Sequence, residues 1–513
     1  MSLKKLAKNT FSNSTSLFVR MAISYMLTPI LINNLGSEAY GVWMLMATFT
    51  LAGSLSLFSF GFQGALVKYV AEFHTLNKLK EINELFSATF IFFTSMAAIC
   101  AVGLSFFSYF FLERVFEIPV HQVPDAQVVL FIFAVMAIFD LPGMAISAII
   151  EGIQRYDILA ALDIGRIAIF CGAAIVILKR GSGVVPLALA LASSTIFYTV
   201  ALAICTKKLL PSWRIELGAD RKNLRELFVF SRDLFILRVN GLIYNNMDKM
   251  IVGMILGTVF VTEYDIANRI HAIALMVMGL APSAVLPAAS AFDAANDNER
   301  QTKLLLQGSK YTTAMALPIV LTLFILAEGL IKFWISPQYA HVALYARLFL
   351  LYMLFWPIIQ VGWNMLVGVN KIKSIVPLQT FSVAVNLILS IILVKYIGVS
   401  GTMIGTIFAN LLIFFAYMRL ITDTFKVPLG HFIKTVVVPA YSLGLALFIV
   451  LFAVVVMRQP ESLIQVGVYA LISILVYYTG FFVFCIDRKE QVVFTEMYRN
   501  LQSKISQALL GRA

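Results

Sequence analysis

The feature that most constrains this chain is a set of polar and charged side chains within residues 233–272, a stretch otherwise apolar enough to cross a membrane. A charge at mid-bilayer costs roughly 2.5–3.5 kcal/mol, so a helix carrying several must face protein or a water-filled cavity. At about 100° per residue, the polar residues form two neighbouring stripes. One stripe holds Asp233, Asn240, Tyr244 and Asp248, and the other holds Arg238, Asn245 and Lys249. This pattern favours a helix that lines a transport pathway; the alternative is a polar network that only holds helices together.

The composition agrees with a helical membrane protein that crosses the bilayer many times. Of the 513 residues, 60% are hydrophobic and only 13% are charged, and such a chain has long apolar runs of the length that spans a bilayer. Windows of about 20 apolar residues predict fourteen spans. They cover residues 10–34, 39–66, 85–112, 127–150, 157–178, 184–206, 225–253, 258–289, 304–331, 342–368, 375–396, 399–421, 431–457 and 463–485.

The distribution of basic residues predicts the orientation of these spans. If both termini are cytoplasmic, the segments on the inner side of these spans hold twenty-two Lys and Arg residues and the outer loops hold five. Cytoplasmic loops of membrane proteins carry such an excess of positive charge, which supports the even number of spans and this orientation. The net charge of +12 therefore indicates cytoplasmic loops and not a nucleic-acid partner.

The two halves of the chain contain similar short sequence motifs, here called marks, in the same order. Leu35-Gly36-Ser37 precedes Tyr40 as Leu256-Gly257-Thr258 precedes Tyr264, and two further pairs of marks follow at similar offsets. Each repeat returns after an even number of spans, so the halves share one orientation, and a site is expected between them. The predicted fold is all-α, with two pseudo-symmetric six-helix bundles and two added C-terminal helices around a central cavity. The predicted parts are an N-terminal bundle (1–206), a cytoplasmic linker (207–224), a second bundle (225–422), two additional spans (431–485) and a cytoplasmic amphipathic tail (486–513).

Arginine is in excess among the charges at membrane depth. Asp163 lies three residues before Arg166, and Asp265 lies four before Arg269, so each of these pairs can neutralise itself on one helix. By contrast, Arg20, Arg238 and Lys249 have no acid at these spacings. The planar guanidinium fork suits phosphate oxygens, and a cationic cavity therefore suggests an anionic ligand such as a lipid diphosphate. Arg–Asp pairing between helices is the alternative.

Three acids at membrane depth lack a partner on their own helix, and they are candidates for ion coupling: Asp140, Asp233 and Asp248. Asp140 precedes Leu141-Pro142-Gly143, where proline favours a kink. A structural acid paired with an arginine is the alternative interpretation of Asp140.

The chain shows no signature of an enzyme. It contains no Gly-rich phosphate loop, no HExxH and no nucleophile elbow. The five histidines are scattered, and the four cysteines lie in or beside apolar runs, so we expect free thiols, no metal site and no cofactor. Without an ATP site, uphill transport would need an ion gradient of H⁺ or Na⁺, or the membrane potential.

Two sets of motifs resemble the polysaccharide exporter family. The first is Pro29-Ile-Leu-Ile-Asn-Asn-Leu-Gly-Ser-Glu-Ala-Tyr-Gly41 with Phe60-Gly61-Phe62. The second is Asp248-Lys249-Met-Ile-Val-Gly253 followed by Tyr264-Asp265-Ile-Ala-Asn-Arg269. Together they resemble the O-antigen (Wzx-type) and exopolysaccharide flippases of the multidrug/oligosaccharidyl-lipid/polysaccharide exporter superfamily.

This resemblance implies a flippase that moves an undecaprenyl-diphosphate-linked oligosaccharide across the bacterial inner membrane by alternating access, coupled to H⁺ or Na⁺. It also implies partners in polysaccharide polymerisation. The family's cavities are lined by spans 1, 2, 7 and 8 with basic residues toward the diphosphate. Here the candidate cavity residues are Arg20, Arg238, Lys249, Arg269, Asn240, Tyr244 and Asn245. One departure is Ser59, which stands where the family often has an acid at the end of span 2.

The alternatives differ in substrate or in class. A lipid II flippase of the same superfamily would also have fourteen spans. A cation-coupled small-molecule antiporter usually has twelve, and a cationic cavity suits it poorly. A polysaccharide polymerase or ligase would carry its active site on a long outer loop, and the predicted outer loops are short. A scaffold without transport activity would not need arginines in the membrane.

Overall fold

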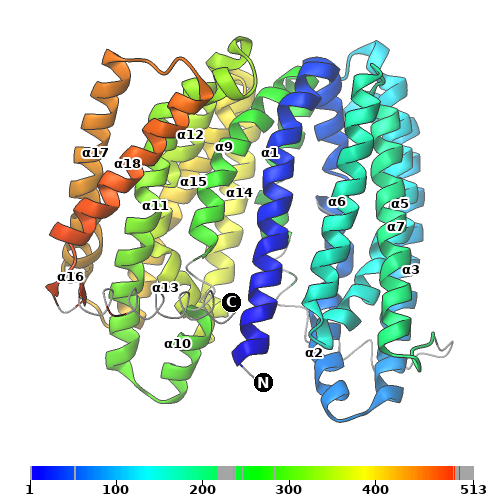
Figure 1. Cartoon of the computed structure of the whole chain (residues 1–513), viewed down its shortest axis with the longest axis horizontal. Helices are drawn as coiled ribbons and strands as arrows, with labels where there is room; N and C mark the ends of the chain where they lie inside the picture. The colour runs from blue at the N-terminus through cyan, green and yellow to red at the C-terminus, as the bar shows by residue number, and fades with distance from the viewer. Residues whose placement is uncertain are drawn as a thin grey trace, which may run out of the picture. The chain divides into compact units, whose positions relative to one another are not determined.

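The computed structural model describes residues 3–50, 53–215, 235, 239–244, 246–280, 285–488, 490–491 and 496. The described part is helical and contains no strand. Its α-helices are α1 (Leu3–Ala47), α2 (Phe62–Thr75), α3 (Leu79–Phe110), α4 (Leu112–Val115), α5 (Val123–Gly152), α6 (Tyr156–Lys179), α7 (Val184–Leu209), α9 (Thr258–Leu280), α10 (Val285–Ala294), α11 (Asn298–Trp334), α12 (Ala343–Tyr352), α13 (Trp356–Gly368), α14 (Ile372–Ile397), α15 (Ser400–Thr424), α16 (Leu429–Phe432), α17 (Val438–Met457) and α18 (Leu463–Phe484). Figure 1 colours these helices from blue near the N-terminus to red near the C-terminus. Short 3₁₀ or π turns lie at Ser54–Ser59, Val120–Gln122, Pro337–Val342 and Ile433–Val437. Residues 239–244 and 246–255 are also helical.

Ten of the described helices are long and apolar enough to cross a membrane, and eleven if the bent pair Pro337–Tyr352 and Trp356–Gly368 forms one span. The prediction of a polytopic helical membrane protein is therefore confirmed. These helices correspond to all the predicted spans except 39–66, 258–289 and 225–253, and much of 225–253 lies outside the described residues. The count of fourteen spans, the pseudo-symmetric bundles and the predicted domain boundaries remain predictions.

The helix α1 turns back on itself at Gly36, where φ is 78° and ψ is 170°. A single guanidinium, that of Arg269, donates to the Ser24 hydroxyl (3.0 Å) and to the Tyr40 hydroxyl (3.1 Å). In a straight helix these two residues would be about 24 Å apart, which one guanidinium cannot bridge. The positive φ is readily adopted only by glycine, which explains the Leu-Gly-Ser mark at this position.

The segment that follows this turn is broken. The helix ends at Ala47, a 3₁₀ turn occupies Ser54–Ser59, and α2 begins at Phe62. The backbone NH and side chain of Ser54 both donate to the Thr48 carbonyl at 2.8 Å, so the chain folds tightly between them. Residues 39–66 were predicted as one continuous span; a hydropathy window does not detect such a break, because the broken segment stays apolar.

The chain divides into two compact units. Unit 1 comprises residues 1–269 and 379–409, and in it α5 packs against α3 and α7 while α6 packs against α1 and α7. The core of this unit is an apolar cluster of α2, α3 and α5 that includes Phe86, Phe93 and Ile149. The helix α5 runs on through Pro142 without a break in its helical assignment.

Unit 2 comprises residues 270–378 and 410–513 and is built on α11, which packs against α13, α17 and α18. It contains a buried cation, Lys310 of α11, whose side chain is 8% exposed. The Lys310 Nζ lies 3.1 Å from the Glu490 carboxylate, to which Gln307 also donates at 2.9 Å. The chain after α18 is thus fastened to α11 by an ion pair.

Candidate functional site

A cavity of 430 Å³ lies within unit 1, and four basic side chains line it: Arg20, Arg166, Lys249 and Arg269. Its other lining residues come mainly from α1, the broken segment after it, α6 and α7. Basic groups from four segments of the chain therefore face one volume.

The first two cations share one carboxylate. Arg20 on α1 and Arg166 on α6 donate to the two oxygens of Asp163 at 2.5 and 2.8 Å. The guanidinium of Arg166 also lies 5.4 Å from the centre of the Tyr198 ring, a cation–π contact. The Arg20 side chain is 54% exposed and that of Asp163 only 11%, so the arginine reaches into the cavity while its acid stays behind it. Two positive charges share one negative charge here, which leaves an excess of one.

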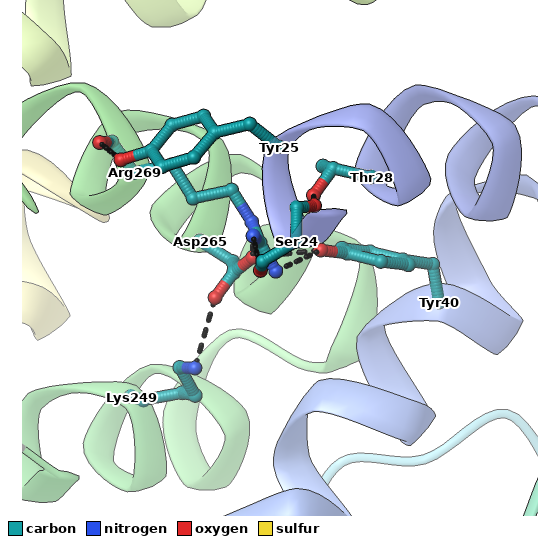
Figure 2. A network of polar contacts seen from close by, with 7 residues as sticks. All are labelled: Ser24, Tyr25, Thr28, Tyr40, Lys249, Asp265 and Arg269. Carbon is teal, nitrogen blue, oxygen red and sulfur yellow. Dashed lines mark hydrogen bonds and ion pairs between the residues drawn. The ribbon is translucent and has the colours of Figure 1, made fainter. Parts of the chain in front are cut away.

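The second pair of cations repeats this arrangement. Lys249 Nζ lies 2.9 Å from one oxygen of Asp265, and Arg269 Nε lies 2.8 Å from the other. Figure 2 shows both side chains converging on this carboxylate, with Tyr40 beside it. The Tyr40 hydroxyl donates to Asp265 at 2.7 Å, and Asp265 is buried. This pair again carries an excess of one positive charge.

The rest of the cavity wall offers apolar and hydroxyl surfaces. Trp43 and Phe170 both line it and stack at 6.4 Å with an interplanar angle of 8°. Thr48 and Thr50, at the break after α1, line it as well. A broken helix whose ends line a cavity is the usual way for irregular backbone to exist at membrane depth. The thiol-bearing Cys171 is also on this wall and is free.

A second polar cluster surrounds Asp248, which is buried and does not line the cavity. Ser390 of α14 donates to one carboxylate oxygen at 3.0 Å, and Thr406 of α15 donates to the other at 3.2 Å. The Asn386 amide donates to Thr406 at 2.7 Å. Among the residues that the structure describes, no Lys, Arg or His forms an ion pair with Asp248. A buried carboxylate with neutral partners is costly unless it binds a proton or a cation.

The two predicted stripes face different neighbours. In the first stripe, Asn240 donates to Thr380 of α14 at 2.8 Å, and Asp248 meets Ser390 of the same helix. Tyr244 is half-buried on the same face. In the second stripe, Lys249 faces the cavity.

Several candidate residues are not brought into either cluster. Arg238, Asn245 and Asp233 lie outside the described residues. Asp140 is half-buried on α5 near Arg166 and does not line the cavity. Within the described part of the chain, no group of three or more His, Cys, Asp and Glu side chains is arranged to hold a metal ion.

The sharing of each carboxylate by two cations does not follow from the sequence. Asp163 and Asp265 were expected to neutralise an arginine on their own helices, and the structure confirms both of these contacts. Each also binds a second cation from elsewhere, Arg20 in one case and Lys249 in the other. Arg20 and Lys249 are therefore paired between helices, which is the alternative that the sequence left open. The i,i+3 and i,i+4 spacings reveal only contacts within one helix.

Comparison with known protein families agrees with this architecture. Residues 6–293, more than half of the chain, match the family model described as polysaccharide biosynthesis protein. The chain belongs to this family. Residues 238–392 also match the MatE family model, which places the protein in the multidrug/oligosaccharidyl-lipid/polysaccharide exporter superfamily.

One curated relative is the probable low-salt glycan biosynthesis flippase Agl15 of Haloferax volcanii. The two proteins are 23% identical over an alignment of 196 residues, which covers 36% of this chain. The match spans 39% of that relative's length.

Solved structures of the same superfamily share the fold. The lipid II flippase MurJ in an inward closed conformation superposes with a TM-score of 0.69 at 15% identity, over 93% of this chain and 98% of that one. An inward-facing multidrug resistance MATE family transporter has a TM-score of 0.67 at 14% identity, over 79% and 94%. The protein is thus a multi-pass membrane protein with the fold of these transporters.

Proposed function

We propose that this protein is a flippase that moves an undecaprenyl-diphosphate-linked oligosaccharide, an O-antigen or exopolysaccharide repeat unit, across the bacterial inner membrane by alternating access. The observation that carries this proposal is the cavity in which two pairs of cations each share a single carboxylate. Within the described residues, the count is four positive charges against Asp163 and Asp265, an excess of two; an ionised Asp140 near Arg166 would reduce it to one. A diphosphate supplies negative charge and several acceptor oxygens for such groups.

The sign of this charge separates the candidate functions. A cavity with surplus positive charge repels a cationic drug, which disfavours the antiporter. Lipid II and oligosaccharide repeat units present the same diphosphate to the cavity, so their headgroup sugars must distinguish them. The family match to polysaccharide biosynthesis and the glycan flippase relative support the oligosaccharide.

We further propose that Asp248 is the coupling carboxylate, which binds H⁺ or Na⁺ during the cycle. Its hydroxyl and amide surroundings offer oxygen atoms, and it has no ion pair within the described residues. Because Asp248 lies outside the cavity wall, ion binding and headgroup binding would occupy separate places in unit 1.

The test is leaflet transfer of a fluorescent undecaprenyl-diphosphate oligosaccharide in proteoliposomes, with lipid II assayed in parallel. Arg20→Ala should reduce transfer at least tenfold, because it removes a cavity cation that is half-exposed and therefore not needed for packing. Arg180→Ala is the matched control, since Arg180 is an exposed arginine just after α6 and does not line the cavity. Full transfer by the Arg20 variant would remove the cationic cavity from the mechanism. Transfer of lipid II alone would replace the proposed substrate.

A further inference from the structure

Asp265 lies behind the cavity wall and holds groups of two kinds. Toward the cavity it accepts from Lys249 and Arg269. The same carboxylate also accepts from the Tyr40 hydroxyl, and neither Tyr40 nor Asp265 lines the cavity. Tyr40 is fully buried, and its hydroxyl also accepts from Arg269 at 3.1 Å. One buried acid thus joins two cavity cations to a tyrosine that does not itself line the cavity.

Tyr40 belongs to a tight crossing of two segments, residues 37–41 and residues 258–262, which we call the outer clasp. The Thr262 hydroxyl donates to the Ser37 carbonyl at 2.6 Å. A Cβ added at Gly41 would lie 1.8 Å from the Thr258 carbonyl oxygen, so only glycine permits this approach. The backbones are therefore in direct contact, and the crossing leaves no path for a solute between these segments.

The outer clasp is formed by segments that correspond in the two sequence repeats. The offset between Gly36 and Gly257 is 221 residues, so Ser37 corresponds to Thr258 and Gly41 to Thr262. The contact of Gly41 with Thr258 therefore corresponds to the contact of Thr262 with Ser37: shifting each residue to its equivalent in the other repeat turns one contact into the other. In such a self-complementary interface each segment presents the same surface to the other. Both segments adjoin loops that the distribution of basic residues assigns to the outer face.

We propose that Asp265 and Tyr40 couple occupancy of the cavity by an anionic headgroup to opening of the outer clasp. This inference rests on the proposed function. A phosphate in the cavity attracts Lys249 and Arg269, the two cations that now neutralise Asp265. When these two cations turn toward the phosphate, the buried Asp265 carboxylate keeps only the Tyr40 hydroxyl among its three hydrogen-bond partners. A buried carboxylate with so few partners is unfavourable unless water reaches it. Separation of the outer clasp admits that water, so headgroup binding lowers the stability of the closed clasp.

The experiment measures closure of the outer clasp by cross-linking. Ser37→Cys and Thr262→Cys are introduced into a chain whose native cysteines are replaced, and a short bifunctional thiol reagent is added in proteoliposomes. The probe ligand is farnesyl diphosphate. We expect farnesyl diphosphate to slow cross-linking at least threefold, because it shifts the clasp toward the open state. In the Tyr40→Phe background the cross-linking rate should already be low without farnesyl diphosphate, because the link between Asp265 and the clasp is lost. Adding farnesyl diphosphate should not change this rate.

Tyr25→Phe is the matched control. The Tyr25 hydroxyl donates to the Arg269 backbone carbonyl at 2.5 Å, whereas the Tyr40 hydroxyl donates to the Asp265 carboxylate itself. This variant loses a hydroxyl near the same arginine, and its cross-linking should keep the parent's response to farnesyl diphosphate. If Tyr40→Phe fails to fold by size-exclusion chromatography, Asp265→Asn serves instead, and its cross-linking should likewise not respond.

Binding is scored separately, by protection of Cys171 from alkylation in a chain that keeps this cysteine alone. Protection of Cys171 without a change in cross-linking would overturn the coupling and leave the proposed function standing. The coupling would also be overturned if farnesyl diphosphate slowed cross-linking in the Tyr40→Phe variant as much as in the parent. Failure of farnesyl diphosphate to protect Cys171 would count against the cationic headgroup site itself, and the coupling would fall with it.

Discussion

Net charge in the cavity, and not any single arginine, should set its affinity for a diphosphate. Among the described residues, Arg20→Ala lowers the excess from two to one, because it removes one of the four cavity cations and leaves both acids in place. A hydrogen bond to a charged group is worth roughly 1.5–3 kcal/mol, and the 54% exposure of Arg20 places it at the lower end. We therefore expect a loss of about 1.4 kcal/mol, which is a tenfold weaker affinity for farnesyl diphosphate.

The double variant Arg20→Ala/Asp163→Asn tests this reasoning. It removes the acid together with the arginine, which restores the excess of two and frees Arg166 for the ligand. Affinity should recover to within about threefold of the parent, since each unit of charge contributes on the order of 1 kcal/mol at an exposed site. The assay is isothermal titration calorimetry in detergent. At high salt, the differences in affinity between the parent and each of the two variants should shrink, because salt screens the charges. A double variant that binds no better than Arg20→Ala would refute the charge argument.

Three further predictions concern other parts of the chain. With the other cysteines replaced, Cys171 should react faster with an anionic than with a cationic methanethiosulfonate, after correction for their rates with a free thiol; equal rates would contradict a cationic cavity. Asp248→Asn should abolish transfer driven by an ion gradient but leave affinity for farnesyl diphosphate unchanged, and loss of both would contradict separate sites. Glu490→Gln should lower the melting temperature, because an unpaired buried Lys310 costs roughly 3 kcal/mol, whereas Lys303→Gln on the exposed side of α11 should not. Burial raises the pKa of Glu490, but hydrogen bonding and attraction from Lys310 outweigh it and hold that pKa below its ordinary value. The ion pair should therefore stabilise the protein at neutral pH and be lost as pH falls through this lowered pKa, and the Gln variant should lack this acid-dependent loss.

The sequence predicted well whatever depends on local spacing. Apolar runs identify the spans that the structure confirms, since hydropathy along one helix suffices for that. The Asp163–Arg166 and Asp265–Arg269 pairs follow from helical spacing alone. The polar stripes on residues 233–249 predicted a helix with protein or a cavity on two sides, and its described residues contact α14 and the cavity.

Contacts between distant segments could not be predicted. Asp163 meets Arg20 across 143 residues, and Asp248 meets Ser390 across 142. Nothing in one helix indicates which face of another helix it will contact, and a serine among apolar residues carries no signal for a buried acid. The break after Ala47 was also missed, although Gly53 directly precedes the 3₁₀ turn within it and Gly61 directly precedes α2.

The ion pair between Lys310 and Glu490 has a consequence for how the protein is made. Lys310 leaves the ribosome 180 residues before its partner. At about 5–20 residues per second, the lysine waits roughly 10–40 s before Glu490 is synthesised. During that interval α11 carries an unneutralised charge, so a nascent chain must keep Lys310 hydrated or bound to the insertion machinery. Assembly of unit 2 is therefore completed only at the end of translation, and a chain truncated before Glu490 would never reach that point.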